Sequence, residues 1–553
     1  MLVVFGALLP SFAGAQHTEH KNGIVVAVSE PGADAGLAIL KRGGNAVDAA
    51  IATAFAQAVT HPAAGNIGGG GFMVVHSPSS SPRLRGRLAT VIDYREVAPA
   101  AATRTMFKKG ESPYSHKMVG VPGVVRGMAL AHQKFGKLPW KDLVMPAVEL
   151  AEKGYILDKH HADSLNKMIA LTKKNAEFQR VFARADGEKW KPGDRHVQAD
   201  LAKTLRLIAE DGPDAFYVGK IADQVVAEMK SGGGLITKED LAKFKAIQRV
   251  PIHGTYRGYD VYSPPPPCSG GTCLVLMLNM LERFDLKKHG RYSPPTLHLL
   301  AETMRLTYAD RARYLGDPAF TKIPDFLTTK SYAAERVKKI NLAKANRSED
   351  IAREIKLTNE GESTTHFSVI DQDGMAVSNT YTLEHSFGSR IVVKGAGFLL
   401  NNEMMDFNWR PGITTKKGDI GTEPNTIAPG KKMLSSQTPT ILAKDGKVFL
   451  VTGSPGGRTI INTVLNIVVN VVDYEMPIQQ AIDAPRMHHQ WFPDELKFEG
   501  AKQYPKTVEA LKAMGHRVVF SRQGDAHSIW VNPRTGGYIG AADKRLSGKA
   551  SGY

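Results

Sequence analysis

Two helices are predicted near the start of the chain by the spacing of their apolar residues. The first begins after Ser29, a residue type that favours helix N-caps, and ends at the Gly43-Gly44 pair. The second is capped by Asn45 and covers residues 46–59, which are rich in alanine and apolar at helical spacing. Both are expected to pack one apolar face against a sheet.

A run of glycines at residues 65–71 follows these helices and is itself followed by the apolar strand pattern of residues 72–75. Dinucleotide-binding loops place their glycines after a strand and before a helix. Here the glycines come before the strand, so that motif is excluded and close backbone packing is indicated. A hairpin-like partner strand is predicted over residues 89–95.

The middle of the chain, from about residue 128 to 339, is mostly helical in pattern. One strand is predicted over residues 250–262. The Pro/Gly block that follows, residues 264–271, has apolar sequence on both sides, which favours a stiff core loop over a solvent-facing linker. Strand patterns dominate after residue 364, and this shift indicates two structural parts that share one sheet core.

A hairpin after residue 364 carries the most informative chemistry. A polar segment, residues 341–363, ends in a strand that turns at residues 372–374 and returns. A three-residue loop with glycine last is a favoured hairpin connection, and its register places Thr364 opposite Thr382. Paired hydroxyls below such a segment suit a self-cleaving threonine nucleophile. An ordinary hairpin of β-favouring threonines explains the same pattern.

A second candidate site lies where an apolar strand, residues 447–452, leads into a helical pattern, residues 459–472. Gly456 and Gly457 stand at the mouth of that helix, where unpaired backbone N–H groups and the macrodipole favour negative charge. This placement suits an oxyanion hole. A tight strand-to-helix turn would also explain the two glycines.

A third cluster combines hydroxyls and carboxylates on either side of a long Gly/Pro/Lys-rich loop, residues 408–432. Glu403 and Asp406 precede the loop, and Ser435 and Ser436 follow it. Together they are able to bind both ends of a zwitterion. As isolated residues they are equally well explained as solvated caps.

Length and charge limit the possible classes. The chain has 553 residues, 42% of them hydrophobic, which allows a large core and two to four domains. Its apolar stretches are shorter than the roughly 18 residues that cross a bilayer, so no integral membrane segment is expected. The net charge of +17 is spread among acidic residues rather than gathered with aromatics, which argues against nucleic-acid binding.

The N-terminal residues 1–15 read as the apolar region of a secretory signal. Ala13-Gly14-Ala15 supplies a small-x-small cleavage pattern, so the mature chain is expected to begin near Gln16 and to be exported, periplasmic or secreted. The usual basic start is missing, which suggests a start upstream of Met1. A buried N-terminal helix is the alternative.

Cysteine and histidine positions indicate no metal site. Cys268 and Cys273 are five residues apart at a turn, a spacing that allows a small disulfide, but two free thiols fit a core of this size better. His488 and His489 are adjacent and point to opposite sides of extended chain. We expect neither a metal nor a cofactor.

Long motifs in a fixed order give the chain a resemblance to γ-glutamyltranspeptidases, which are N-terminal-nucleophile hydrolases. The resemblance runs from about residue 20 to the C-terminus and is highly specific. The matching segments are GGGGFMVV at 68–75, DYREVAP at 93–99, TTHFSV at 364–369, TYTLEHSFG at 380–388, LLNNEMMDF at 399–407, LSSQTPT at 434–440 and VTGSPGGR at 451–458.

The resemblance implies an α+β fold of four layers, αββα, with two stacked antiparallel sheets between helices. It also implies that the precursor cleaves itself between Ser363 and Thr364. The products would be a large subunit, residues 16–363, and a small catalytic subunit, residues 364–553, which remain together as a heterodimer. Thr364 would then use its own free α-amine as the base.

The resemblance implies that the substrates are glutathione and other γ-glutamyl compounds. It also implies a role for each site residue. Thr382 would orient the nucleophile, with Gly456 and Gly457 as oxyanion-hole donors. The substrate α-carboxylate would be bound by an arginine and two serines, and its α-ammonium by acidic residues. These residues are Arg95, Ser435, Ser436, Asp406 and Glu403, with Glu384 nearby.

Two departures from the family pattern and two alternatives accompany this reading. Glu384 stands where many relatives have Asn, and Lys417 stands in the lid-like loop where well-known bacterial members have Tyr, which bears on lid closure and on transfer against hydrolysis. A glutaryl-cephalosporin acylase shares the fold and nucleophile but binds a side chain without an α-ammonium. An autoprocessed but inactive envelope binding protein is the alternative from another class.

Overall fold

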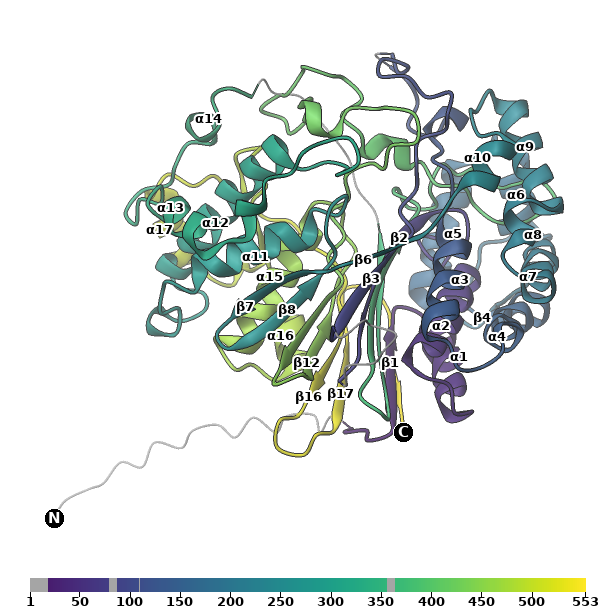
Figure 1. Cartoon of the computed structure of the whole chain (residues 1–553), viewed down its shortest axis with the longest axis horizontal. Coiled ribbons are helices and arrows are strands. Elements are labelled where there is room, and N and C mark those ends of the chain that lie inside the picture. The colour runs from purple at the N-terminus through teal and green to yellow at the C-terminus, as the bar shows by residue number, and fades with distance from the viewer. Residues whose placement is uncertain (1–17, 79–86, 109, 356–363) are drawn as a thin grey trace.

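The computed structural model describes residues 18–78, 87–108, 110–355 and 364–553. Two antiparallel sheets lie face to face between two layers of helices (Figure 1). The four-layer αββα prediction is therefore confirmed. In spatial order, the seven-stranded sheet contains β18 (Lys549–Gly552), β1 (Gly23–Ala27), β9 (Thr365–Asp371), β10 (Ala376–Thr382), β2 (Gly70–His76), β3 (Ala89–Asp93) and β6 (Ile247–Arg249).

The second sheet has six strands and draws on both halves of the chain. Its order is β17 (Tyr538–Ala542), β16 (His527–Val531), β12 (Lys447–Thr452), β11 (Thr440–Lys444), β8 (Tyr259–Ser263) and β7 (Ile252–Tyr256). Two smaller sheets lie outside these. One pairs β4 (Tyr155–Ile156) with β5 (Arg195–His196), and the other has three strands, β13 (Met487–His488), β14 (Leu496–Phe498) and β15 (Val518–Val519).

The helices divide between the outer faces of the two sheets (Figure 1). The seven-stranded sheet is covered from the N-terminal part of the chain, by α1 (Glu30–Lys41), α2 (Ala46–Thr60), α3 (Val124–Phe135), α4 (Trp140–Lys153), α5 (Lys159–Leu171), α6 (Ala176–Phe182), α7 (Ala199–Asp211), α8 (Asp214–Tyr217), α9 (Lys220–Gly232) and α10 (Lys238–Lys243). The other side carries α11 (Gly270–Leu281), α12 (Pro294–Tyr314), α13 (Lys330–Val337), α14 (Ser348–Ile351), α15 (Thr459–Val472), α16 (Ile478–Asp483) and α17 (Pro505–Ala513).

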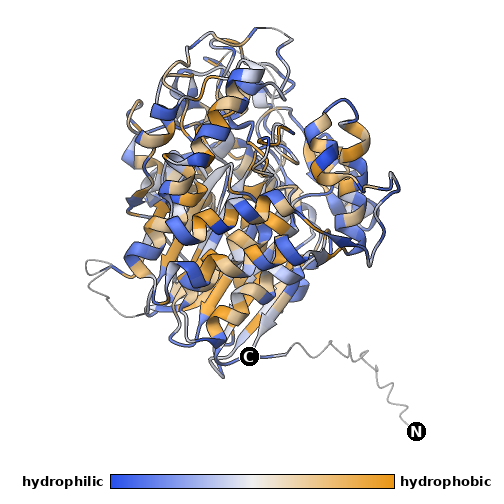
Figure 2. Ribbon diagram, turned by 90° about the vertical axis from the view of Figure 1, so that its right-hand side faces the viewer, coloured by the Kyte–Doolittle hydropathy of each residue, from blue (hydrophilic) through white to orange (hydrophobic). Residues whose placement is uncertain are grey.

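Alternation along the strands creates a separate apolar layer at each of the three interfaces. In β9, Phe367 and Val369 pack toward the helices, whereas Ile370 packs between the sheets. In β12, Leu450 faces the other helical layer and Val451 faces the first sheet. Figure 2 shows the consequence: the strands are largely orange, while the helices in front of them carry both blue and orange residues. Burial of each such side chain contributes roughly 2 kcal/mol.

Both helix starts predicted from the sequence are confirmed. The Ser29 hydroxyl accepts a hydrogen bond from the Gly32 N–H at 3.3 Å, and Asn45 forms a capping box with Asp48. The Pro/Gly block is also buried as predicted, and it leads directly into α11. N-cap residues predict helix starts well because the cap accepts hydrogen bonds from the unpaired N–H groups of the first turn, whatever the tertiary context.

The single strand predicted over residues 250–262 is wrong. The structure has two antiparallel strands there, β7 and β8, joined at Arg257 and Gly258. Both turn residues have positive φ, 49° and 82°, the backbone that a two-residue hairpin turn requires. The apolar pattern continues through the turn and hides the reversal.

The glycine run before β2 is a site of close backbone approach, as predicted. A Cβ on Gly69 would lie 1.9 Å from the Thr382 carbonyl oxygen, and one on Gly68 would lie 2.2 Å from the Leu399 carbonyl oxygen. Only glycine allows these segments to lie against the end of β10. The run therefore helps to place Thr382.

Candidate active site

The hairpin of β9 and β10 positions the predicted nucleophile. The Asp371 N–H donates to the Met375 carbonyl at 3.0 Å, and Gly374 adopts φ 76°, so the three-residue loop is present. The register that follows brings the hydroxyls of Thr364 and Thr382 within 3.4 Å. Ser363 lies outside the described residues.

The Thr382 hydroxyl is itself held in place. It accepts a hydrogen bond from the Glu384 N–H at 2.8 Å, while the Thr382 carbonyl accepts from the Asn66 side chain at 3.0 Å. Glu384 has φ 74°, an unusual conformation for a residue with a side chain. The chain therefore bends sharply just after the hydroxyl that faces Thr364.

A small cavity of about 20 Å³ joins Thr364 to most of the other predicted residues. That volume holds about one water molecule. It brings together residues from seven separate stretches of sequence. The lining consists of Arg95, Arg311, Thr364, Thr382, Glu384, Glu403, Asp406, Ser435, Ser436, Gln437, Gly457, Arg458 and Ile460.

Arg95 is the buried cation at the centre of this site. Its Nε donates to the Met433 carbonyl at 3.3 Å, and its terminal nitrogens form ion pairs with Glu403 and Asp406. The sequence assigned the arginine and the acids to opposite poles of a substrate. In the structure they neutralise one another directly, so a zwitterion that binds here has to enter between them.

Burial and charge act against each other on these groups. Burial lowers the pKa of Arg95, but its neighbouring carboxylates more than offset this and raise that pKa above its ordinary value. Burial raises the pKa of Glu403, against the influence of Arg95. Acidic atoms of Glu384, Glu403 and Asp406 all lie within 4.8 Å of one another, which gathers three carboxyl groups as potential partners for an ammonium group.

Glu96 is a further buried acid that the sequence did not single out. It is 0% exposed and lies 3.6 Å from Arg95 Nη1. Among the described residues, neither of its carboxylate oxygens has a hydrogen-bond partner. Burial raises its pKa to about 7, although Arg95 opposes the shift.

The two predicted serines sit on a backbone segment that is fixed by the Pro/Gly block. The Ser435 N–H donates to the Pro267 carbonyl at 2.8 Å, and the Ser269 N–H donates back to the Ser435 carbonyl at 2.7 Å. The Ser435 hydroxyl accepts from the Gln437 N–H at 3.1 Å. This exchange explains why a stiff loop is buried beside the site.

Two lining arginines, Arg311 and Arg458, were missed by the sequence reasoning. Arg311 comes from α12, which carries Arg305 and Arg313 as well, so the helical pattern alone gives no reason to choose it. Arg458 follows the Gly456-Gly457 pair, and that position is a usable signal. Burial lowers its pKa to about 9, with Arg311 adding to the effect.

Gly456 and Gly457 form the turn between β12 and α15, as predicted. Both have positive φ, 126° and 54°, and Gly457 lines the cavity with Thr364. Their carbonyls accept from the N–H groups of Thr459 and Ile460 at 3.1 Å, which anchors the first turn of the helix. The N-terminus of α15 therefore lies beside the cavity, and the oxyanion-hole role of the two glycines stays a prediction.

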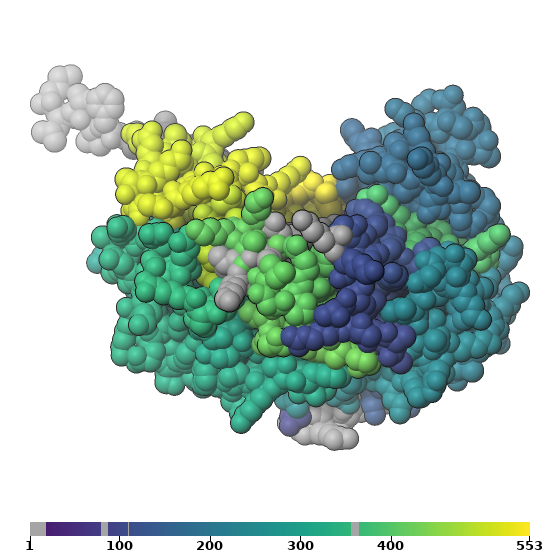
Figure 3. Space-filling view, turned by 90° about the horizontal axis from the view of Figure 1, so that it is seen from above, coloured from purple at the N-terminus to yellow at the C-terminus, as the bar shows by residue number. Residues whose placement is uncertain are grey.

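The long loop before Ser435 lies at the molecular surface. In Figure 3 the green chain near residues 400–430 borders the dark blue segment around residue 100. Arg104 donates to Glu423 at 2.8 Å across this border, and the Ala98 N–H donates to the Lys431 carbonyl at 2.8 Å. Arg458 donates to the Gly418 carbonyl at 2.6 Å, which ties the residue next to Lys417 to the site.

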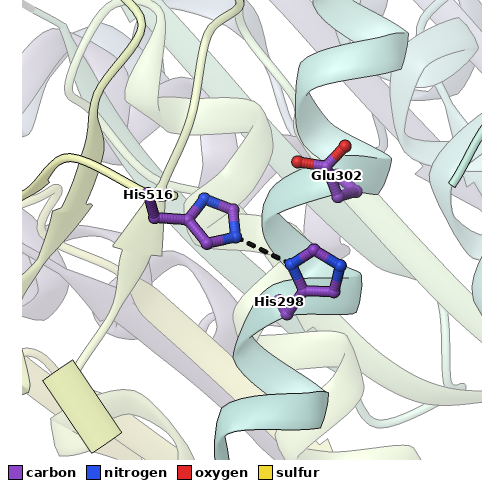
Figure 4. A group of neighbouring side chains, drawn as sticks. All are labelled: His298, Glu302 and His516. Atoms are coloured by element: carbon purple, nitrogen blue, oxygen red, sulfur yellow. Dashed lines mark hydrogen bonds between the residues drawn. The ribbon is translucent and has the colours of Figure 1, made fainter. Parts of the chain in front are cut away.

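One group of possible metal ligands, His298, Glu302 and His516, is not part of the cavity lining. Figure 4 shows His298 and Glu302 on one helix, with His516 facing His298 from another segment. His298 Nε2 donates to the Asn341 carbonyl at 2.7 Å, which leaves its Nδ1 to accept from His516 Nε2 at 2.8 Å. Arg305 donates to Glu302 at 3.1 Å. These bonds occupy the atoms that would hold an ion, so the group is a hydrogen-bonded link between segments.

Three buried histidines, His366, His488 and His489, are hydrogen-bonded to neighbouring side chains. His366 contacts Thr380 at 2.8 Å and Ser368 at 3.1 Å through its two ring nitrogens, and burial lowers its pKa well below the ordinary value. His488 contacts Asn462 at 2.7 Å, whereas His489 contacts Asp494 at 3.2 Å. They point to different partners, as expected.

The cysteines are free, and both are buried. Burial raises the pKa of Cys268 and of Cys273 to about 12, so both are thiols. Across the described residues, no helix combines the length and apolar character that a membrane crossing requires.

A family model described as γ-glutamyltranspeptidase matches residues 32–553. The chain belongs to the γ-glutamyltranspeptidase family. It is 47% identical over 534 residues to a glutathione hydrolase proenzyme of Escherichia coli K12, covering 95% of this chain and 90% of that protein.

The chain is also similar to acylases. An acylase ACY 1 proenzyme of a Pseudomonas strain, SE83, is 35% identical over 544 residues, covering 95% of this chain and 92% of that protein. The solved structure of a cephalosporin acylase from Bacillus halodurans superposes with a TM-score of 0.85 at 29% identity and covers 100% of this chain and 99% of that one. The fold is thus common to both activities, and the site has to distinguish them.

Proposed function

We propose that the chain is a γ-glutamyltransferase and glutathione hydrolase that acts through a γ-glutamyl ester of Thr364. The single observation that carries this is the placement of Thr364, beside Thr382, on a cavity lined by Arg95 and by three convergent carboxylates. A γ-glutamyl group presents a carboxylate and an ammonium on one carbon, and such a cavity offers partners for both.

Maturation precedes this activity in the proposal. The Thr364 hydroxyl attacks the carbonyl carbon of Ser363, the C–N bond between the two residues breaks, and water hydrolyses the resulting ester. Cleavage gives Thr364 a free α-amine, and because an unperturbed α-amine has a pKa near 7.7–8.0, it is able to act as a neutral base at working pH. The products are a large subunit that ends at Ser363 and a small subunit, residues 364–553, that remain associated.

Catalysis repeats the same attack on a bound substrate. The α-amine takes the Thr364 hydroxyl proton, the oxygen attacks the γ-carbonyl carbon, and the departing amine leaves with a proton. The N–H groups of Gly456 and Gly457 are assigned to the developing oxyanion, a contribution of roughly 3 kcal/mol per donor. Water then releases glutamate, or the amine of an amino acid or peptide accepts the γ-glutamyl group.

The corner formed by Glu384, Glu403 and Asp406 favours this function over the acylase alternative. Their acidic atoms lie within 4.8 Å of one another, and Arg95 pairs with two of them, Glu403 and Asp406. A glutaryl group has no ammonium to place against these carboxyl groups. Carboxylates left uncompensated on burial carry a large free-energy cost.

Anilide substrates test the proposal. Release of nitroaniline from γ-glutamyl-4-nitroanilide and from glutaryl-4-nitroanilide is measured with the purified protein and with Thr364→Ala. We expect the γ-glutamyl compound to be hydrolysed much faster, and only by the protein with Thr364. Preference for the glutaryl compound would make the chain an acylase, and inertness toward both would make it a binding protein.

Export completes the proposal. Residues 1–15 lie outside the described residues, and their sequence alone supports a secretory signal that ends near Gln16. N-terminal sequencing of protein recovered from the cell envelope tests this. A large subunit that still begins at Met1 would contradict it.

A further inference from the structure

Arg311 is a second arginine of the cavity that carries no assigned role. It lies on α12, is 8% exposed and lines the cavity with Arg95. Arg95 directs its terminal nitrogens to carboxylates, whereas Arg311 directs its donors to hydroxyls. Its Nε donates to the Ser269 hydroxyl at 2.9 Å and its Nη2 to the Ser436 hydroxyl at 2.9 Å.

These bonds decide which way the Ser436 hydroxyl acts. A serine hydroxyl has one proton and two acceptor lone pairs, and a guanidinium is able only to donate. Because Arg311 occupies an acceptor position of Ser436, the serine proton has to point elsewhere. The Ser435 hydroxyl is in the same state, since it accepts from the Gln437 N–H at 3.1 Å. Neither of these bonds uses the serine proton, so each hydroxyl is able to donate to an anion bound in the cavity.

Arg311 also reaches the backbone of Ser435 through Ser269. The Ser269 hydroxyl accepts from Arg311 and donates to the Ser435 carbonyl at 2.6 Å. One guanidinium thus fixes the hydroxyl of one serine and the backbone of the other. A planar fork with several donors is suited to such a two-way contact, and a lysine ammonium is not.

Charge adds to this effect. Glu403 and Asp406 are ion-paired with Arg95, so much of its positive charge is already balanced. Arg311 places further positive charge at the serine side of the cavity, behind hydroxyls rather than carboxylates. The cavity therefore has an acidic side at Glu384, Glu403 and Asp406 and a cationic, proton-donating side at Ser435 and Ser436.

We propose that Arg311 is a positioning residue for the α-carboxylate of the γ-glutamyl group: it sets Ser435 and Ser436 as paired hydrogen-bond donors and supplies the charge behind them. This inference rests on the proposed function. It assigns recognition of the α-carboxylate to two arginines with different tasks, Arg95 at the acidic side and Arg311 behind the serines.

Three anilides that differ by one group test the proposal. They are γ-glutamyl-4-nitroanilide, glutaryl-4-nitroanilide, which lacks the ammonium, and 4-aminobutyryl-4-nitroanilide, which lacks the α-carboxylate. In Arg311→Met we expect KM for the γ-glutamyl and glutaryl compounds to rise about 10- to 100-fold, with a much smaller change in kcat. Discrimination against the 4-aminobutyryl compound should fall by a similar factor.

Matched variants separate recognition from folding. Arg313→Met removes a neighbouring arginine of the same helix, whose Nε donates to Glu354 at 2.6 Å, and should leave the three KM values unchanged. Arg311→Lys is a smaller change that keeps the positive charge. It should keep part of the discrimination against the 4-aminobutyryl compound. Ser436→Ala combined with Arg311→Met should lose less than the sum of the two single losses.

Equal losses on all three anilides in Arg311→Met and Arg311→Lys would overturn the proposal, because a general structural role predicts them. Unchanged discrimination would overturn it as well. Should Arg311→Met fail to fold, the Arg311→Lys ratios decide alone. Failure of the proposed function is a different result, since the wild-type protein would then hydrolyse none of the anilides or would prefer the glutaryl compound.

Discussion

The hydroxyl of Thr364 lies 3.4 Å from the hydroxyl of Thr382, directly across the hairpin of β9 and β10. A loop one residue longer or shorter would bring Tyr381 or Leu383 alongside Thr364 instead, because side chains alternate along a strand. The contact therefore depends on the three-residue turn that ends at Gly374. The length of the loop and the orientation of Thr364 are linked in this fold.

Thr382→Val tests this link. The substitution keeps the shape and strand preference and removes the hydroxyl that faces Thr364. We expect both precursor cleavage and kcat of matured enzyme to slow by about 1 to 3 kcal/mol, typical of one hydrogen bond. Thr440→Val, which removes a buried hydroxyl bonded to the Thr438 carbonyl, serves as the control. Wild-type rates in Thr382→Val would show that the contact between the two hydroxyls contributes to neither precursor cleavage nor turnover.

Thr364→Ala should remain a single chain of full precursor size, because the attacking hydroxyl is gone. Thr364→Ser keeps a hydroxyl and should still yield two chains. Thr365→Ala, at the next position, should be processed normally. Gel electrophoresis and N-terminal sequencing of the small chain give the answer. Processing of Thr364→Ala at the same bond would point to an external protease.

Arg95→Lys keeps the charge and loses the fork that meets Glu403 and Asp406. We expect KM for γ-glutamyl-4-nitroanilide to rise about 10-fold or more, since a lysine ammonium does not reproduce bidentate geometry. Asp406→Asn should also raise KM and leave self-cleavage intact. Arg180→Lys, a surface fork on Glu177, is the matched control. Unchanged KM in both site variants would mean that these residues do not bind substrate.

Glu96 should make stability depend on pH. Its folded pKa, about 7, lies above the ordinary value of 4.5, so the folded state holds the proton more tightly. The contribution of Glu96 to the free energy of unfolding is largest below about pH 4.5 and decreases as the pH rises to about 7. The total change is about 3 kcal/mol. Glu96→Gln should remove this slope.

Urea unfolding at pH 5 and pH 8 measures the slope, in the uncut Thr364→Ala background with and without Glu96→Gln. The difference between the two proteins isolates Glu96 from other titrating groups. Equal slopes would show that Glu96 is ionised throughout or does not change its pKa on folding.

Gly69→Ala should disturb the site from behind the hairpin. Its Cβ would lie 1.9 Å from the Thr382 carbonyl oxygen, so the end of β10 has to move. We expect a loss of about 1 to 3 kcal/mol in stability, together with slower precursor cleavage. Gly219→Ala, whose Cβ would meet nothing closer than 3.2 Å, is the comparison. Normal cleavage in Gly69→Ala would separate this packing from the position of Thr382.

Local signals predicted much of this molecule. The turn at residues 372–374 and strict alternation together define the register that pairs Thr364 with Thr382, and Ser29 and Asn45 mark helix starts. Such features depend on neighbours in sequence. The reversal at Arg257 was missed because an apolar pattern says nothing of direction.

Long-range contacts were less accessible. Long motifs singled out Arg95, Glu403 and Asp406 as site residues, and the structure places all three on one cavity. Their direct ion pairs depend on how separate loops meet, which the sequence does not show. Arg311 is one of several arginines on α12, and only the fold shows that it faces Ser436. No periodicity distinguishes it from Arg313, two residues away.

The order of strands in the seven-stranded sheet affects whether the cleaved protein is able to refold. In the seven-stranded sheet, β9 and β10 lie between β1 and β2, so a break before Thr364 leaves strands of two polypeptides interleaved. Only the unbroken precursor folds from one end to the other as a single molecule. Once broken and then denatured, the halves would have to find each other in dilute solution. Unfolding of the mature protein would therefore be irreversible, and its lifetime would be set by its unfolding rate rather than by an equilibrium.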